Sequence, residues 1–157
     1  GPWTLPFKDK KQDMADVRDY WEKDDALFHS EVGAPGAQSV AMMKKYGGTY
    51  NPLPASLDNP LWRIVFWWNE WDDYLSSHNG QAPTTLDDYV RWSQQRQIDG
   101  VTIAMGTCKK HFPRCGGVIL WMGHDSFPCM SNTSIIDFDG NLKPAALELS
   151  KILKNKN

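Results

Sequence analysis

The chain has 157 residues, of which 41% are hydrophobic, and a formal net charge of −2 at pH 7. This near-neutral balance excludes the strongly basic surface that nucleic-acid binding requires, and no apolar run approaches the ~20 residues that cross a bilayer. We therefore expect one globular domain with neither a nucleic acid nor a membrane among its partners.

Helical and extended segments alternate in the first half of the chain. They are a helix over 12–23, a strand over 26–30, a helix over 37–46, a loop over 47–60 and a helix over 61–74. Val17 and Trp21 lie on one face of the first helix, at the spacing of an amphipathic helix. The loop is indicated by its two glycines and three prolines, which interrupt regular structure.

The clearest helix is expected from about Thr85 to Lys109. Thr84 or Thr85 can cap its N-terminus, and Asp87 and Asp88 lie where a negative charge favours the positive helix end. Three segments complete the chain: a strand over 118–121, a short extended piece over 134–138 and a last helix that begins at Lys143-Pro144.

Two core strands that alternate with helices predict an α/β fold in which the strands run parallel. A closed (β/α)8 barrel needs eight strands and typically ~250 residues. The chain therefore has too few strands for a barrel of its own.

Glu31 stands in the most informative stretch, Phe28-His29-Ser30-Glu31-Val32-Gly33. A strand cannot continue through Gly33, Pro35 and Gly36, so this carboxylate is predicted where a strand stops. In α/β barrels the carboxyl ends of the strands present the catalytic side chains, and a carboxylate there can act as a nucleophile, an acid or a base. The alternative interpretation is a solvated glutamate before a turn.

Two later segments add to this pattern. They are Gly117-Val-Ile-Leu-Trp-Met-Gly-His-Asp-Ser-Phe-Pro128 and Ser134-Ile-Ile-Asp-Phe-Asp-Gly-Asn-Leu-Lys-Pro-Ala145. With the Glu31 stretch they resemble the C-terminal part of the catalytic TIM barrel of glycoside hydrolase family 2, above all its β-mannosidase and exo-β-glucosaminidase branch. That branch carries Ser-Glu-Tyr/Phe-Gly, Trp-Gln-x-Asn-Asp-x-Trp-Pro and Ile-Asp-Tyr-x-Gly-x-x-Lys-Pro. The resemblance covers roughly residues 15–153.

The resemblance implies that residues 1–157 form the C-terminal part of such a barrel, with strands seven and eight and their helices. It implies a retaining exo-β-glycosidase, β-mannosidase-like, in which Glu31 is the catalytic nucleophile. Trp121 matches the tryptophan that floors the sugar site. His124 and Asp125 match the Asn-Asp pair and are expected to bind the substrate, although a histidine replaces the family's asparagine.

A retaining glycosidase needs a second carboxylate ~5–5.5 Å from the nucleophile. The family's acid/base residue is the glutamate of an Asn-Glu pair upstream of the nucleophile. Asn69-Glu70 has this sequence but lies downstream of Glu31, so we expect Glu70 to be a surface carboxylate on a helix beside the active site. The chain alone is then inactive, and its partners are a carbohydrate substrate and the remainder of the barrel or another chain.

The alternative function is a non-catalytic carbohydrate-binding or scaffold fragment that keeps the sugar-binding floor. Most of the eight tryptophans are expected in the core. Cys108-x-x-His111-x-x-x-Cys115 resembles half of a zinc site, which would need Cys129 or His124 as a fourth ligand. We expect no metal and no cofactor.

Overall fold

The computed structural model describes residues 14–155 and shows a mixed arrangement of helices and short strands. In chain order the elements are α1 (Met14–Lys23), β1 (His29–Val32), β2 (Gly36–Ala37), α2 (Val40–Tyr46), α3 (Pro60–Arg63), the 3-10 helix η1 (Phe66–Trp68), α4 (Trp71–Ser77), α5 (Leu86–Lys110), β3 (Val118–Leu120), β4 (Ser131–Asn132) and α6 (Pro144–Lys154). Within residues 14–155, no helix is both long and apolar enough to cross a membrane.

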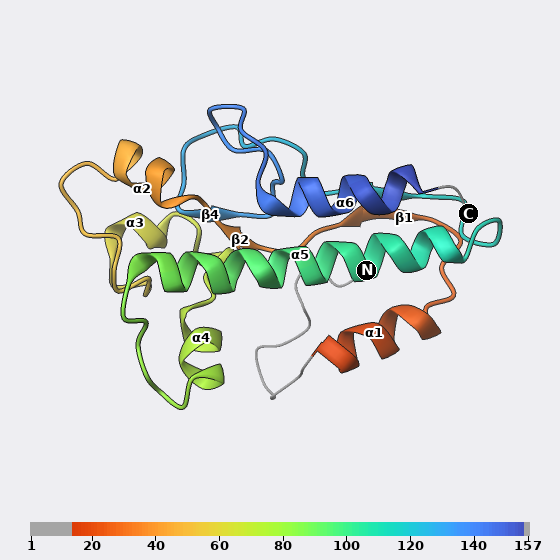
Figure 1. Cartoon of the computed structure of the whole chain (residues 1–157), viewed down its shortest axis with the longest axis horizontal. Helices are drawn as coiled ribbons and strands as arrows, with labels where there is room; N and C mark the ends of the chain where they lie inside the picture. Colours follow the sequence, from red (N-terminus) through yellow and green to blue (C-terminus); the bar gives the residue numbers. More distant parts are fainter. Residues whose placement is uncertain (1–13, 156–157) are drawn as a thin grey trace.

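Helix α5 is the central element, and it runs along most of the molecule (Figure 1). Its N-terminus carries a capping box, in which the Thr85 hydroxyl accepts a hydrogen bond from the Asp88 N–H and the Asp88 carboxylate accepts one from the Thr85 N–H, both at 3.1 Å. This confirms the predicted start and length of the helix. Helices α1 and α6 both pack against α5, while α2, α3 and α4 gather around its N-terminal end.

Strands β1 and β3 pair in parallel, as predicted, with His29 opposite Val118 and Val32 opposite Leu120. The first strand begins later than the predicted 26–30, because the Asp24 carboxylate accepts hydrogen bonds from the Ala26 N–H and the His29 ring and holds this segment in a turn. Glu31 therefore lies inside the strand, one residue before its end.

A second pairing was not predicted. After the break at Gly33 and Pro35, the chain extends again as β2, which pairs antiparallel with β4. The described residues thus contain two separate two-stranded sheets. They form a mixed helix and strand unit with a β1-α5-β3 crossover.

The prediction of one helix over 61–74 was wrong. The Asn69 side chain accepts a hydrogen bond from the Trp71 N–H and donates one to the Ala55 carbonyl, so the backbone at residue 69 is extended and a new helix starts after it. The segment is therefore divided among α3, η1 and α4. The short polar side chain of Asn69 competes successfully with the helical hydrogen bonds.

The tryptophans divide between core and surface. Trp21 and Trp62 are buried, and Trp71 and Trp92 pack against the cluster around Trp62. Trp67 and Trp121 are exposed, and Trp3 lies outside the described residues.

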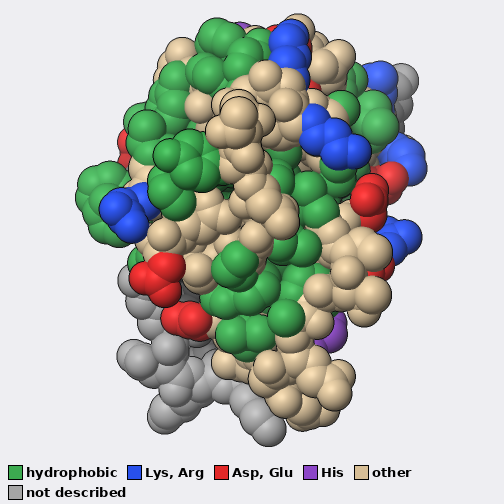
Figure 2. Space-filling model, turned by 90° about the vertical axis from the view of Figure 1, so that its left-hand side faces the viewer, with side chains coloured by type: hydrophobic (Ala, Val, Ile, Leu, Met, Phe, Trp, Pro, Cys, Tyr) green, Lys and Arg blue, Asp and Glu red, His purple; other side chains and the backbone are tan. Residues whose placement is uncertain are grey.

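Figure 2 views the end of the molecule where α2 and α3 lie, and hydrophobic side chains gather at the surface there. Between residues 40 and 68, the large exposed hydrophobic side chains are Tyr50, Leu57, Ile64, Phe66 and Trp67. A gathering of this kind is typical of a surface that contacts another protein or part of the same protein.

Gly33 follows β1 directly and lies against the backbone of Trp121, which follows β3. A Cβ atom at residue 33 would lie 2.2 Å from the Trp121 carbonyl oxygen, which is a backbone atom that cannot rotate away. We expect Gly33→Ala to lower the free energy of unfolding by about 3 kcal/mol, at the upper end of the usual cost of overpacking. Urea unfolding measures this loss.

Gly123→Ala is the matched control, because a Cβ atom there would meet no atom within 4 Å. Equal urea midpoints for Gly33→Ala and Gly123→Ala would contradict the close approach.

Candidate active site at the ends of β1 and β3

Glu31 lies on β1 with its side chain half-buried. Among residues 14–155, no hydrogen bond or ion pair reaches its carboxylate. The neighbouring Ser30 is exposed, and His29 and Val32 are buried. The carboxylate therefore stands at the surface of the described unit, next to the end of its strand.

His29 anchors the beginning of β1. Its Nε2 lies 2.8 Å from Asp24 Oδ2, and its ring packs edge-on against Trp21, with 5.0 Å between ring centroids. These contacts join α1 to β1 and fix the strand from which Glu31 projects. His29 therefore has a structural role in joining α1 to β1.

Trp121 follows β3 directly and lies beside the end of β1. Its N–H donates to the Val32 carbonyl at 2.8 Å, which extends the parallel pairing by one bond. The side chain is 42% exposed, so it is not buried under α6. The fold thus brings the backbone of Trp121 next to the residue that follows Glu31.

His124 and Asp125 have opposite environments. His124 is exposed, whereas Asp125 is 1% exposed and its two oxygens accept hydrogen bonds from Gln38 Nε2 at 2.6 Å and Asn132 Nδ2 at 2.8 Å. A fully buried carboxylate with both oxygens engaged orders the chain around it. The contact between Asp125 and a sugar stays a prediction.

A buried polar cluster behind β2 was missed by the sequence analysis. Lys143 is buried, and its Nζ donates to the carbonyl of Gly36 at 2.8 Å and to that of Asn132 at 3.4 Å. Burial lowers the pKa of Lys143 to about 8, and the Asp125 charge opposes this shift. Gln97 of α5 donates to the carbonyl of Ala34 at 3.0 Å.

Lys143 and Gln97 fix the segment that follows Glu31 through hydrogen bonds to its backbone carbonyls. The one available signal was the i, i+4 placement of Ser93 and Gln97 on the inward face of α5, where polar side chains need partners.

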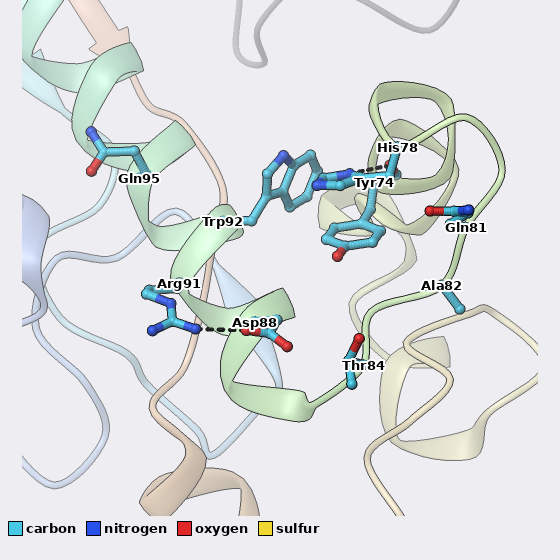
Figure 3. Close-up of a pocket in the computed structure, with 9 residues that line it drawn as sticks. All are labelled: Tyr74, His78, Gln81, Ala82, Thr84, Asp88, Arg91, Trp92 and Gln95. Carbon is cyan, nitrogen blue, oxygen red and sulfur yellow. Dashed lines mark hydrogen bonds and ion pairs between the residues drawn. The ribbon is translucent and has the colours of Figure 1, made fainter.

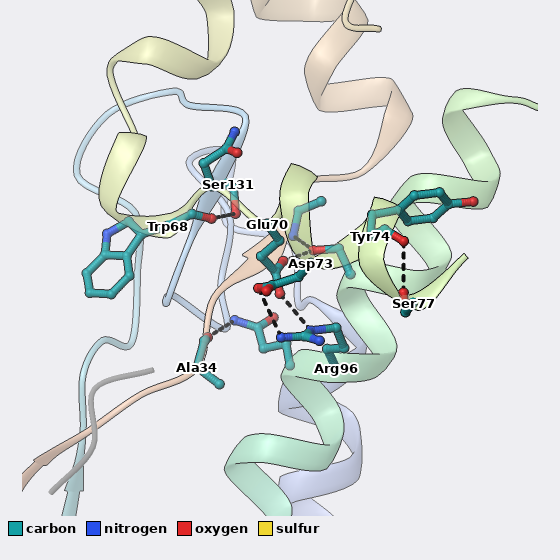
Figure 4. Close-up of polar contacts among 12 residues, drawn as sticks. Ala34, Trp68, Glu70, Asp73, Tyr74, Ser77, Arg96 and Ser131 are labelled. Carbon is teal, nitrogen blue, oxygen red and sulfur yellow. Dashed lines mark hydrogen bonds and ion pairs between the residues drawn. The ribbon is translucent and has the colours of Figure 1, made fainter. Parts of the chain in front are cut away.

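Glu70 is buried, so the prediction of a surface carboxylate was wrong. It receives hydrogen bonds from Ser93 Oγ at 2.5 Å and Arg96 Nε at 3.0 Å, and Arg96 also reaches Asp73 at 3.4 Å (Figure 4). Burial raises the pKa of Glu70 to about 7, although the Arg96 charge lowers it.

The Ser93 hydroxyl connects Glu70 to β2. It accepts a hydrogen bond from the Ala37 N–H at 2.8 Å while it donates to the carboxylate. Glu70 therefore fixes α4 against α5 and β2. Both carboxylate oxygens are engaged in this role.

The three cysteines are buried thiols. Burial raises the pKa of Cys108 to about 12 and that of Cys129 to about 11, so both are protonated at neutral pH. Within residues 14–155, no group of three or more histidine, cysteine or acidic side chains is arranged to hold a metal ion. The Cys108, His111 and Cys115 spacing does not produce such a group.

No protein-family model matches this sequence, and no curated protein sequence matches it. Among solved structures, the chain is similar to a β-D-mannosidase from Dictyoglomus thermophilum, with a TM-score of 0.63 and 20% sequence identity. The similarity covers 86% of this chain and 17% of the mannosidase chain. At this identity the similarity shows the fold alone. The chain folds like part of a β-mannosidase and spans a small fraction of its length.

Proposed function

We propose that this chain is the nucleophile-bearing part of a retaining β-mannosidase-like glycoside hydrolase, built as strands seven and eight of a TIM barrel. The observation that carries the proposal is the parallel pairing of β1 and β3, which brings the Glu31 strand end next to Trp121. The similarity to part of a β-mannosidase is consistent with this arrangement.

In the proposed reaction, the Glu31 carboxylate attacks the anomeric carbon while the glycosidic bond to the leaving oxygen breaks and that oxygen receives a proton. Water then gives a proton to the acid/base residue as its oxygen attacks the anomeric carbon, which breaks the bond to Glu31, releases the sugar and restores the carboxylate. Glu31 must be ionised for the first step. In this proposal the hydrogen-bond donors that stabilise it come from outside residues 14–155, because none of these residues donates a hydrogen bond to the carboxylate.

The proton donor also comes from elsewhere in the proposed enzyme. Glu70 has the right chemistry, but it is buried and bound by Ser93 and Arg96. We therefore assign Glu70 to the structure of the helical segment and the acid/base role to a carboxylate of the remaining barrel.

Trp121 provides the sugar-binding floor in this proposal, since its partly exposed indole offers a flat apolar face to the C–H face of a pyranose ring. His124 follows Trp121 closely in the sequence and is exposed to solvent, and we propose that it contacts a sugar hydroxyl. Asp125 contributes indirectly, by holding the segment between β3 and β4 through Gln38 and Asn132.

The remaining barrel strands are the proposed partner of the β1–β3 sheet. Each of the two strands has one edge without a strand partner among residues 14–155, and such edges invite further pairing. Leu27, Phe28 and Ile119, at or just before these strands, are more than half exposed. We expect the isolated chain to self-associate and to be inactive on nitrophenyl β-glycosides, as measured by light scattering and hydrolysis assays.

A monomeric isolated chain with robust activity would contradict this expectation. Activity that disappears in Glu70→Gln would show in addition that Asn69-Glu70 supplies the acid.

A second candidate function is a non-catalytic carbohydrate-binding fragment. It is favoured by the hydrogen bonds of Glu70 to Ser93 and Arg96, because they leave this carboxylate no catalytic role. Hydrolysis of nitrophenyl β-mannoside separates the two, because only the first function breaks the glycosidic bond. If the enzyme containing this chain is a β-mannosidase, Trp121→Ala lowers kcat/KM for nitrophenyl β-mannoside about 100-fold, because the ring floors the reacting sugar.

Trp67→Ala removes another exposed indole and serves as the control, with kcat/KM unchanged. Mannoside binding without any hydrolysis would favour the non-catalytic function. Equal kcat/KM in Trp121→Ala and the parent protein would remove Trp121 from the site.

A further inference from the structure

A pocket lies apart from Glu31 and Trp121, between α4, the loop over 78–84 and the first turns of α5 (Figure 3). Its volume is about 590 Å³. Pockets that bind small molecules range from roughly 300 to 1,000 Å³. The pocket is therefore large enough for one or two sugar rings.

Aromatic side chains form one wall of this pocket. The Tyr74 and His78 rings are stacked, with 3.9 Å between centroids, and the Trp92 ring meets Tyr74 edge-on at 5.0 Å. The Arg96 guanidinium lies over the Trp92 ring, 4.8 Å from its centroid. These contacts hold the aromatic wall in place before any ligand arrives, which reduces the entropy cost of binding.

Polar side chains of α5 lie on either side of Trp92 along the helix, with Asp88 and Arg91 before it and Gln95 after it (Figure 3). The Asp88 carboxylate and the Arg91 guanidinium are paired at 2.6 Å, so their charges offset each other. Gln95 adds an exposed amide, which offers both a donor and an acceptor. Aromatic rings beside donors and acceptors without net charge suit an uncharged ligand with many hydroxyl groups.

We propose that this pocket binds a sugar unit of the substrate that does not react. The choice of ligand rests on the proposed glycosidase function, while the pocket itself rests on the geometry of α4 and α5. The next residue of α5, Ser93, binds the Ala37 N–H of β2. Helix α5 thereby joins the pocket to the segment that follows Glu31.

The test is a titration of the protein with β-1,4-mannobiose, followed through the tryptophan indole N–H signals in NMR spectra. The Trp92 signal is assigned with Trp92→Phe. We expect a saturable shift of this signal with millimolar affinity. The double variant Arg91→Ala/Gln95→Ala should weaken binding about tenfold, because it removes hydrogen-bonding groups from the rim.

Arg18→Ala is the matched control, since it removes an exposed arginine from α1, far along the chain from the pocket. It should leave the affinity unchanged, and so should Trp121→Ala. An unmoved Trp92 signal at saturating mannobiose would overturn the pocket proposal.

The titration also separates the pocket from the proposed active site. Binding that disappears in Trp121→Ala and persists in Arg91→Ala/Gln95→Ala would place the sugar at the ends of β1 and β3. That result would overturn the pocket as a sugar site and leave the proposed glycosidase function standing. Loss of the glycosidase function is measured separately, by the hydrolysis of nitrophenyl β-mannoside.

Discussion

Glu31→Gln is expected to lower kcat for β-mannoside hydrolysis by several orders of magnitude in the enzyme that contains this chain. The amide is nearly the size of the carboxylate but cannot form the glycosyl ester, so the first chemical step is lost. The side chain is half-buried and makes no hydrogen bond within residues 14–155, so the fold should be preserved. Steady-state kinetics and circular dichroism measure the two effects.

Glu22→Gln is the control, because Glu22 is an exposed glutamate of α1. Its kcat should equal that of the parent. A small anion distinguishes the nucleophile from the acid/base. With Glu31→Ala and an activated aryl β-mannoside, azide should attack from the vacated side and give the α-glycosyl azide. A β-glycosyl azide would show that Glu31 is the acid/base instead.

Glu70→Ala is expected to cost about 3–5 kcal/mol of unfolding free energy, the usual loss when one partner of a buried ion pair is removed. The substitution leaves the largely buried Arg96 without its main partner and leaves Ser93 Oγ without an acceptor. Urea unfolding at neutral pH measures the loss. A change below 1 kcal/mol would contradict the structural role.

The same carboxyl group predicts a pH dependence. Its pKa is about 7 in the folded protein and 4.5 ordinarily, so the folded state holds the proton more tightly than the unfolded state. The contribution to stability is fully present below pH 4.5 and is lost as the pH rises through 7, and it amounts to about 3 kcal/mol. Glu70→Gln keeps an acceptor for Ser93 and cannot ionise.

Unfolding free energies of the parent and of Glu70→Gln should therefore diverge between pH 4.5 and pH 8, with the parent losing more stability as the pH rises. Parallel curves across this range would show that Glu70 stays ionised in the folded protein.

The sequence predicts the elements whose signals are local. Helix α5 has its capping threonine and acidic first turn, and α6 begins at Pro144 as expected. The parallel pairing of β1 and β3 followed from the alternation of strands and helices. The break at Asn69 was missed, because the partner that stabilises it, the Ala55 carbonyl, is 14 residues away.

The environments of the acidic residues could not be predicted from the sequence. The residues around Asp125 and Glu70 in the sequence do not show whether either carboxylate is buried or exposed. Asp125 accepts hydrogen bonds from Gln38 and Asn132. Glu70 accepts one from Ser93, which lies beyond the 78–84 loop in the sequence. These contacts join residues that are between 7 and 87 positions apart, so only the folded chain reveals them.

The most direct test of the central proposal is to trap the covalent intermediate. A 2-deoxy-2-fluoro-β-mannosyl fluoride slows both steps but still forms the glycosyl ester, so it should label the enzyme in proportion to its loss of activity. Digestion and mass spectrometry should then find the sugar on Glu31, within the peptide that includes Phe28 to Gly33. A label on any other carboxylate would contradict the assignment of Glu31 as the nucleophile.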